Sequence, residues 1–386
     1  MKLRREMGLV WVLPLALVLG ACSSSSSKAV MGQDAGAGGE AGSADGAAGH
    51  ADGGAPSGGE AGGSAAGEPA GGSAGEAGET GGPIVVATIS AAPAALDLAG
   101  GVLYFTVKDG VPGEGKVQSV SVNGGTVSTL ASALPNPRNI AVNDGNVYWA
   151  DTETVFPDAG DVMAMPVAGG TPHEVATCET NARLVINGST LYCLTNDLSK
   201  LSAFPLAGAA GVGTPVAASS DGAVEAYDSD GSSVFWFAAA AVDFDLYRTP
   251  LLNPSDTDLA MAATSGSAAF DYLTHDTSAL YWSDSGTGGV YSLPKAGGTP
   301  LLLASYETAS APVQLLLDGN TIYALRSNTL TKFPKTGGTP TVLASVSGTG
   351  TDRYVADTVN ASALAVDDQF VYWTYQGHAQ ILKIAK

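Results

Sequence analysis

Residues 279–305 read ALYWSDSGTGGVYSLPKAGGTPLLLAS and contain three apolar runs of strand length, separated by turn residues. The first run has counterparts along the chain, and seven copies are centred on Tyr104, Tyr148, Tyr192, Phe235, Tyr281, Tyr323 and Tyr372. Successive centres are 44, 44, 43, 46, 42 and 49 residues apart. A repeat of this length, with several short strands in each copy, is typical of the blades of a β-propeller.

Each copy predicts four antiparallel strands. A further apolar run precedes the tyrosine-containing strand, as residues 313–317 do before Tyr323. The Gly297-Gly298 pair supplies the positive φ values that a tight hairpin requires between the third and fourth strands. We therefore expect an all-β fold, a seven-bladed β-propeller of four-stranded antiparallel blades.

The seventh copy lacks a fourth strand, and a matching segment occurs before the first copy. Residues 80–88 read TGGPIVVAT and match the TGGTPTVLA of residues 336–344, which end the sixth copy. We expect Ile84–Thr88 to pair with the blade that contains Tyr372. Such pairing closes the ring and removes the exposed sheet ends of an open array.

Several copies resemble a known repeat. The words Tyr148-Trp149-Ala150-Asp151 and Tyr281-Trp282-Ser283-Asp284 are similar to the YWTD repeat of propellers in low-density-lipoprotein receptors. That family has six blades, and only these two copies here keep the aspartate. The resemblance implies a propeller used for extracellular binding, without naming a ligand.

The first 21 residues are predicted to be an export signal. Lys2, Arg4 and Arg5 precede an apolar run over residues 8–19, which is too short for a transmembrane helix. Leu19-Gly20-Ala21-Cys22 resembles the lipobox of bacterial lipoproteins, which implies cleavage before Cys22 and lipidation of that cysteine. The alternative is an ordinary signal peptide cut after Ala21. The lipobox predicts a cell-envelope location, as an outer-membrane lipoprotein that is periplasmic or surface-exposed.

Residues 22–82 are predicted to form the lipid anchor and a disordered tether, and residues 83–386 to form the propeller. The tether has no aromatic residue and consists mainly of Gly, Ala, Ser and Glu, so it cannot form a core. The propeller segment carries 28 acidic and 13 basic residues. This anionic character disfavours nucleic acid as a partner. We expect a monomer held at the membrane through its lipid.

Two cysteines fall within the predicted propeller. Cys178 and Cys193 form an even pair in an exported domain, which favours a disulfide. Cys193 stands where other copies carry tryptophan, and Cys178 would need its loop to fold back to reach it. The alternative is a buried Cys193 and a free Cys178.

The innermost strands should line the axis of the ring. The repeat position of Arg183 is occupied in other copies by Asn139, Tyr272 and Gln314, and by alanine in three. With the neighbouring acids, the predicted channel-lining residues are Asn139, Arg183, Glu225, Asp271, Tyr272 and Gln314. Such a mixture can hold water or a small polar ligand.

The sequence predicts no metal ligand set and no cofactor, with structural calcium as the alternative. Lactonase-type propellers hold calcium with Glu, Asn and Asp, which Glu225, Asn139 and Asp271 could supply. Arg183 in the same ring would repel a cation, and the four histidines are scattered. The run Asp228–Gly231 lacks the distal glutamate of a calcium loop and predicts a turn between strands.

Loop residues are candidates for a binding rim. Phe156 and Asp158 lie in the long predicted loop of the second blade, and Phe244 lies in the equivalent loop of the fourth. His378 occupies that loop in the last blade. Exposed aromatics between acids suit protein binding, although Phe156 and Phe244 could instead fold back onto their own blades.

These features predict a lipid-anchored, exported binding or scaffold module for an unknown protein or glycan, and not an enzyme. Two alternatives stay open. The first is a periplasmic scaffold in outer-membrane assembly, and the second is a calcium-dependent lactonase or hydrolase.

Overall fold

The computed structural model describes residues 81–386 apart from residues 109–112, 153–158, 180–182, 196–197, 208–209, 212, 220–221, 240–243, 264–269, 307–311, 313 and 347–362. The predicted signal peptide, Cys22, nearly all of the predicted tether, Phe156 and Asp158 lie outside the described residues. No helix in the described part of the chain is long and apolar enough to cross a membrane.

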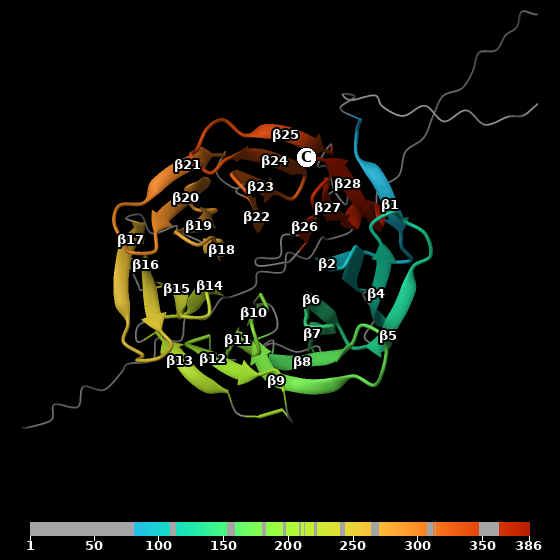
Figure 1. The fold of residues 1–386 in the computed structure, drawn as a ribbon, viewed down its shortest axis with the longest axis horizontal. Coiled ribbons are helices and arrows are strands. Elements are labelled where there is room, and N and C mark those ends of the chain that lie inside the picture. The colour runs from blue at the N-terminus through green and yellow to red at the C-terminus, as the bar shows by residue number, and fades with distance from the viewer. Residues whose placement is uncertain are drawn as a thin grey trace, which may run out of the picture. The chain divides into compact units, whose positions relative to one another are not determined.

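The described chain forms seven four-stranded antiparallel sheets arranged in a ring, which confirms the predicted fold (Figure 1). The strands of each blade are given from the innermost to the outermost. Blade 1 consists of β2 (Pro93–Ala99), β3 (Val102–Val107), β4 (Gly115–Ser121) and β5 (Ser128–Leu134), and blade 2 of β6 (Pro137–Asn143), β7 (Asn146–Thr152), β8 (Ala159–Pro166) and β9 (His173–Glu179). Blade 3 consists of β10 (Val185–Asn187), β11 (Thr190–Leu194), β12 (Lys200–Pro205) and β13 (Thr214–Ala218), and blade 4 of β14 (Val224–Ser229), β15 (Ser233–Ala239), β16 (Phe244–Pro250) and β17 (Thr257–Ala263).

Blades 5 to 7 follow the same plan. Blade 5 consists of β18 (Phe270–His275), β19 (Ala279–Asp284), β20 (Gly289–Pro294) and β21 (Leu301–Ser305), and blade 6 of β22 (Gln314–Asp318), β23 (Thr321–Leu325), β24 (Thr329–Pro334) and β25 (Thr341–Ser345). Blade 7 consists of β26 (Leu364–Val366), β27 (Phe370–Tyr375), β28 (Gln380–Ala385) and β1 (Ile84–Thr88), with the short 3₁₀ helix η1 (Gln376–His378) between β27 and β28.

The ring closes through the N-terminal strand, as the sequence predicts. Strand β1 pairs antiparallel with β28, with Ile84 opposite Lys383 and Thr88 opposite Gln380. Val86, Ala87 and Ile89 are buried against residues of blades 1 and 7. Blade 7 is therefore built from both ends of the folded domain, as the first and last colours of Figure 1 show side by side.

The core lies between neighbouring blades, and the YWTD-like words supply its largest side chains. Trp149, Trp236, Trp282 and Trp373 all lie on second strands and are almost fully buried. Trp282 of blade 5 packs edge-on against Phe237 of blade 4, with ring centroids 5.6 Å apart. Each such aromatic residue buries about 150–250 Å². The repeated aromatic phrase therefore fixes how one blade packs on the next.

The Gly-Gly turns also join neighbouring blades. Gly297 and Gly337 have φ values of +87° and +88°, which side chains with a Cβ rarely adopt. A Cβ on Gly337 would lie 3.0 Å from the carbonyl oxygen of Leu303, in the outer strand of the preceding blade. The turn between third and fourth strands thus needs glycine for its backbone conformation and for close packing.

Candidate functional site: the central channel

The first strands of the seven blades surround the axis of the ring (Figure 1). Between them lies a cavity of about 370 Å³, lined by residues from all seven blades. This volume is at the small end of the range of about 300–1,000 Å³ found for ligand pockets. The cavity is our candidate functional site.

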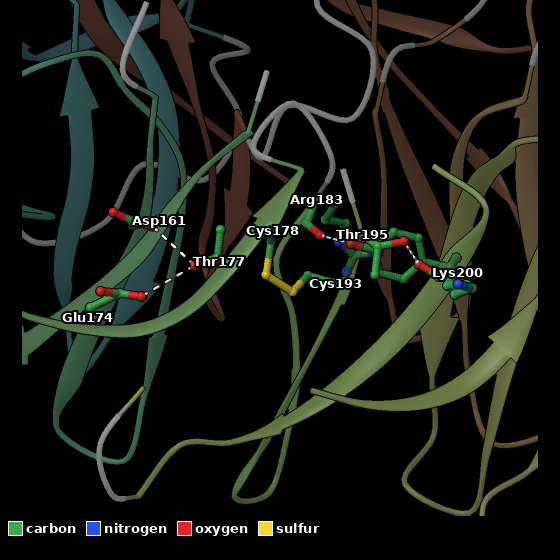
Figure 2. Close-up of a disulfide and its surroundings, with 9 residues drawn as sticks. Asp161, Glu174, Thr177, Cys178, Arg183, Cys193, Thr195 and Lys200 are labelled. Atoms are coloured by element: carbon green, nitrogen blue, oxygen red, sulfur yellow. Dashed lines mark hydrogen bonds between the residues drawn. A yellow bond between two sulfur atoms is a disulfide. The ribbon is translucent and has the colours of Figure 1, made fainter. Parts of the chain in front are cut away.

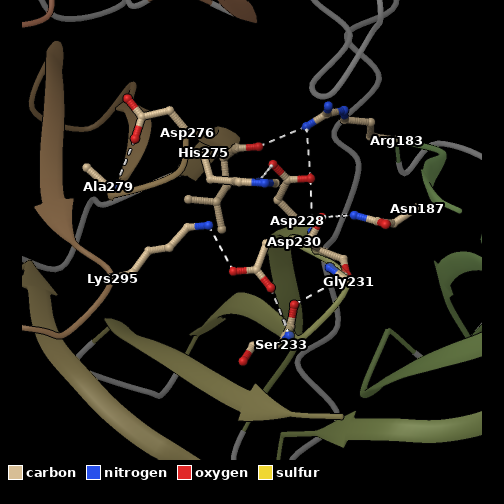
Figure 3. Close-up of polar contacts among 12 residues, drawn as sticks. Arg183, Asn187, Asp228, Asp230, Gly231, Ser233, His275, Asp276, Ala279 and Lys295 are labelled. Carbon is tan, nitrogen blue, oxygen red and sulfur yellow. Dashed lines mark hydrogen bonds and ion pairs between the residues drawn. The ribbon is translucent and has the colours of Figure 1, made fainter.

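Charged side chains gather on one arc of the cavity, formed by blades 3, 4 and 5. Arg183 precedes β10, Asp228 lies in β14 and His275 ends β18. The Nδ1 atom of His275 lies 2.7 Å from Oδ2 of Asp228, and Nη1 of Arg183 lies 3.8 Å from Oδ1 (Figure 3). Arg183 Nη1 also donates a hydrogen bond of 2.9 Å to the carbonyl oxygen of Leu273. Three successive blades therefore meet at one buried carboxylate.

Arg183 is further held by aromatic residues. Its guanidinium carbon lies 4.7 Å from the centre of the Tyr272 ring, within the range of a cation–π interaction. The Tyr227 hydroxyl donates a hydrogen bond of 2.5 Å to the carbonyl oxygen of Arg183. These contacts fix both the backbone and the side chain of the arginine.

A second acid enters the cavity from blade 1. Asp97 accepts hydrogen bonds of 2.7 Å from the backbone N–H groups of both Val142 and Leu98. Burial raises the pKa of Asp97 above its usual value, although these two hydrogen bonds and the charge of Arg183 act in the opposite direction. The contact with Val142 also ties blade 1 to blade 2.

Asp97 and Asp228 occupy the same position of the repeat. Each lies opposite the central aromatic residue of its blade, Tyr104 and Phe235 respectively. The other blades place uncharged residues there, namely Ala141, Val185, Thr274, Leu316 and Ala365. Aligning the repeat at this position would have revealed both acids.

Some aliphatic residues also line the cavity. Ala141 and Val142 of blade 2 and Leu316 of blade 6 are partly exposed, whereas Leu96, Ile140 and Leu364 are almost fully buried in the cores between blades. Charged side chains therefore reach the cavity from blades 1, 3, 4 and 5, and the lining residues of blades 2, 6 and 7 are uncharged.

Polar contacts between first strands hold the cavity in shape. Asn143 donates to the carbonyl oxygen of Gly188, and Asn187 donates to that of Ser229, both at 3.0 Å. Gln314 accepts a hydrogen bond of 2.6 Å from the Ala363 N–H. These contacts join blades 2 to 3, 3 to 4, and 6 to 7.

The predicted channel residues separate into three groups. Arg183, Tyr272 and Gln314 line the cavity. Asn139 is buried, and Glu225 accepts a hydrogen bond of 3.2 Å from the Phe270 N–H, but neither lines the cavity. The side chain of Asp271 lies outside the described part of the structure. The prediction therefore identified the arginine but missed Asp97, Asp228 and His275.

The turn predicted over residues 228–231 is correct only for its second half. Asp230 accepts hydrogen bonds of 2.9 Å from the N–H groups of Ser232 and Ser233, as a turn aspartate does (Figure 3). Asp228 instead belongs to β14 and lines the channel. Among the described residues, no group of three His, Cys, Asp or Glu side chains could hold a metal ion.

The described rim residues lie apart from the cavity lining. Phe244 begins β16 and pairs with Ala239 and Ala263, and its side chain is outside the described part. His378 is exposed in η1, with its ring 4.5 Å from that of Tyr375. The His378 ring therefore packs against Tyr375, in the second strand of its own blade.

A disulfide joins Cys178 of β9 to Cys193 of β11 (Figure 2). The two Cα atoms are 6.0 Å apart, and both residues are fully buried. Cys178 lies in the outer strand of blade 2 and not in a loop, so no loop has to fold back. The bridge therefore crosses the interface between blades 2 and 3.

The outer rim of the ring is uneven in polarity. Five large aliphatic residues are about half exposed at the start of the outer strands of blades 5, 6 and 7, namely Leu301, Leu302, Val342, Ile84 and Val85. The equivalent positions of blades 1 and 2 carry Ser128, Thr129, His173 and Glu174. Residues 270–386 contain seven basic and nine acidic residues, whereas residues 83–269 contain six and nineteen. We call the aliphatic set the apolar rim.

No protein-family model and no curated protein sequence matches the chain. Several solved structures are similar in fold, among them the following three. The extracellular domain of a hybrid two-component system from B. thetaiotaomicron has a TM-score of 0.56 at 11% identity over 78% of this chain and 39% of that one. YCF48, solved with a D1 peptide, has a TM-score of 0.54 at 9% identity over 79% and 94%. A prolyl endopeptidase has a TM-score of 0.51 at 12% identity over 78% and 50%.

These similarities establish the propeller fold and no more. This chain spans about two fifths of the extracellular-domain chain of the two-component system and half of the endopeptidase chain. Similar blades therefore serve in proteins of different activity, and function has to be argued from the site.

Proposed function

We propose that this protein is a lipid-anchored binding module of the cell envelope, whose propeller recognises a partner outside the cytoplasm. The observation that carries the proposal is the channel cavity, in which charged side chains from blades 1, 3, 4 and 5 converge beside uncharged residues of the other blades. Concave sites in which a few fixed polar groups converge are typical ligand sites. The contacts between first strands support a site that is already formed before the ligand arrives.

A binding role fits the charged arc better than catalysis does. The Asp228–His275 pair resembles the acid and base of a catalytic triad, which also needs a nucleophile within hydrogen-bond reach of the histidine. Among the described residues, the His275 ring has no hydrogen-bonding side chain other than Asp228. A calcium-dependent hydrolase is the rival function. The prolyl endopeptidase of similar fold is a hydrolase, so this class of enzyme stays an alternative.

The apolar rim favours a protein partner over a glycan. Outer strands of a propeller leave backbone N–H and C=O groups unpaired along one edge, and an extended segment of another protein can add to such an edge. The half-exposed Leu301 and Leu302 of β21 lie next to these groups. Residues 270–386, which form most of blades 5 to 7, carry nearly equal numbers of basic and acidic residues. They therefore repel an acidic partner less than the more acidic residues 83–269 would.

The envelope location rests on Cys22 and is tested by fractionation. In a bacterial host that processes lipoproteins, the wild-type chain is expected in the membrane fraction with an acylated N-terminal Cys22. Cys22→Ser should move it to the soluble envelope fraction. Equal membrane partitioning of the variant would contradict the anchor, and protease treatment of intact cells would separate surface display from a periplasmic scaffold role.

Partner binding is tested by crosslinking in the envelope. Wild-type protein should yield a specific adduct that Leu301→Glu with Leu302→Glu removes. Ser128→Glu with Thr129→Glu, in the outer strand β5 of blade 1, serves as the matched control, because it places the same two charges at equivalent positions outside the apolar rim. Loss of the adduct in this control as well, or in neither double variant, would reject the apolar rim as the contact surface. Stoichiometric calcium in the purified protein would favour the hydrolase.

A further inference from the structure

Arg183 has hydrogen-bonding capacity that the protein does not use. A guanidinium group carries five N–H donors. Its Nη1 atom donates to the carbonyl oxygen of Leu273 and faces Asp228. In the described part of the chain, its Nε and Nη2 atoms have no hydrogen-bond partner. These two atoms form the edge of the guanidinium that typically binds a carboxylate with two parallel hydrogen bonds.

Asp228 does not satisfy this arginine. The separation of 3.8 Å between Nη1 and Oδ1 is too long for a hydrogen bond. Oδ2 is occupied by His275 at 2.7 Å, and Oδ1 accepts a hydrogen bond of 3.0 Å from the Ser229 N–H. The carboxylate is thus held by other groups beside the arginine. The Arg183 side chain is 23% exposed and lines the cavity, so a ligand there can reach the free edge.

The surroundings limit the charge and shape of that partner. Asp97 and Asp228 both line the same cavity, and they would repel a group with two negative charges. The partly exposed aliphatic residues Ala141, Val142 and Leu316 favour a short apolar body next to the charged group. The cavity volume of about 370 Å³ suits a small molecule or the end of a chain.

We propose that the central channel binds a monocarboxylate with a short apolar body, with its carboxylate on the Nε–Nη2 edge of Arg183. This inference rests on the binding role proposed above and names the ligand of the cavity. Two sources have this chemistry. One is a free small organic acid, and the other is the C-terminal carboxylate of a protein partner.

Calorimetric titration of the full-length chain with hexanoate tests the proposal, with hexanamide as the neutral control. Hexanoate should bind at least tenfold more tightly than hexanamide. Arg183→Gln should weaken hexanoate binding at least tenfold, because it removes the charge and the two-atom edge. Arg248→Gln, in β16 and outside the cavity lining, should leave the affinity unchanged. Equal binding of hexanoate and hexanamide, or full binding by Arg183→Gln, would overturn the proposal.

A second variant covers the case in which Arg183→Gln does not fold. Leu316→Trp fills the cavity beside blade 6 and leaves Arg183, Asp228 and His275 in place, so hexanoate binding should again fall at least tenfold. Unchanged affinity in this variant would overturn the proposal. N-acetyl-leucyl-leucine and its C-terminal amide then separate the two sources, since tighter binding of the free acid peptide than of hexanoate would indicate a chain terminus.

The outcomes distinguish this inference from the broader function. If neither hexanoate nor the free acid peptide binds while the envelope adduct persists, the ligand inference is wrong and the binding role stands. If hexanoate binds as expected and no adduct forms, the channel ligand stands and the partner-binding role is wrong.

Discussion

Lys335 and Asp276 form an ion pair across the interface between blades 6 and 5, with 2.9 Å between Nζ and Oδ2. The same relationship links Lys295 to Asp230 at 2.8 Å and Lys386 to Asp318 at 2.6 Å (Figure 3 for Lys295). Each lysine follows the third strand of one blade, and each acid lies at or just after the end of the first strand of the preceding blade. In blades 1 to 4 the lysine position holds Val122, Val167, Leu206 and Leu251. These ion pairs therefore reinforce one half of the ring.

Replacing Lys335 with methionine should destabilise the propeller. The side chains of Lys335 and Asp276 are only 13% and 24% exposed, so solvent screens the pair weakly. Hydrogen bonds to charged groups contribute about 1.5–3 kcal/mol each, and we expect Lys335→Met to lower the free energy of unfolding by about that amount. Urea denaturation measures the change. Lys200→Met, at an exposed position of β12, should change stability by less than about 0.5 kcal/mol, and equal effects would contradict the role of the pair.

Acidification should weaken the same interfaces. Burial acts to raise the pKa of Asp276, but the Ser278 N–H, Lys335, the Ala279 N–H and Tyr281 outweigh it and hold the pKa far below its usual value. The pKa of Asp230 is lowered in the same way, with burial opposed chiefly by Lys295 and Ser232. An acid whose pKa is depressed by folding stabilises the protein above its unfolded pKa of about 4, and this contribution is lost as the pH falls further.

We therefore expect the melting temperature to fall steeply below about pH 4. The double variant Asp230→Asn with Asp276→Asn should melt lower at pH 7, and its melting temperature should fall less between about pH 5 and about pH 2. Differential scanning calorimetry across this range provides the measurement. Parallel curves for wild type and variant would show that these two acids do not dominate the acid response.

Removal of the closing strand should be far more damaging than removal of the segment before it. Deletion of residues 83–90 removes β1 with its buried Val86, removes the buried Ile89 that follows it, and leaves β28 as an open edge. Each of these two side chains contributes about 1.5–3 kcal/mol. The deletion should lower the melting temperature sharply or cause aggregation, whereas a chain starting at Pro83 should melt as the full-length protein does. Similar melting of both variants would be incompatible with closure by β1.

Loss of the disulfide should destabilise the interface between blades 2 and 3. Cys178 and Cys193 are separated by 15 residues, and closing a loop of this size stabilises a protein by about 3 kcal/mol in the chain-entropy treatment. Cys178→Ala with Cys193→Ala should therefore lower the free energy of unfolding by about 2–4 kcal/mol. Dithiothreitol should lower the stability of the wild type and leave the double variant unchanged. Sensitivity of the double variant to the reductant would point away from this bridge.

The amino-acid sequence determined the fold because the blade repeat is a local signal. The aromatic phrase around Tyr281, the Gly297-Gly298 turn and their counterparts recur at nearly constant spacing, and each contact they make reaches only the next blade. The sequence also predicted that the N-terminal strand closes the ring, since residues 80–88 resemble the fourth strand that the last copy lacks. These features depend on short-range backbone conformation and on periodic burial, both of which the order of residues expresses directly.

Only the tertiary structure decided which side chains meet in the channel. Arg183, Asp228 and His275 come from three blades, and Arg183 contacts Leu273, 90 residues later in the chain. Asp228 looked like part of a turn, because an aspartate before Ser-Asp-Gly is common in turns, and its place in β14 was fixed by pairing opposite Phe235. Likewise, the sequence left the disulfide open, since the packing of β9 against β11 is what brings Cys178 to Cys193. Convergence of this kind depends on how far each blade rotates around the axis, which is set by the packing between blades and not by any one repeat.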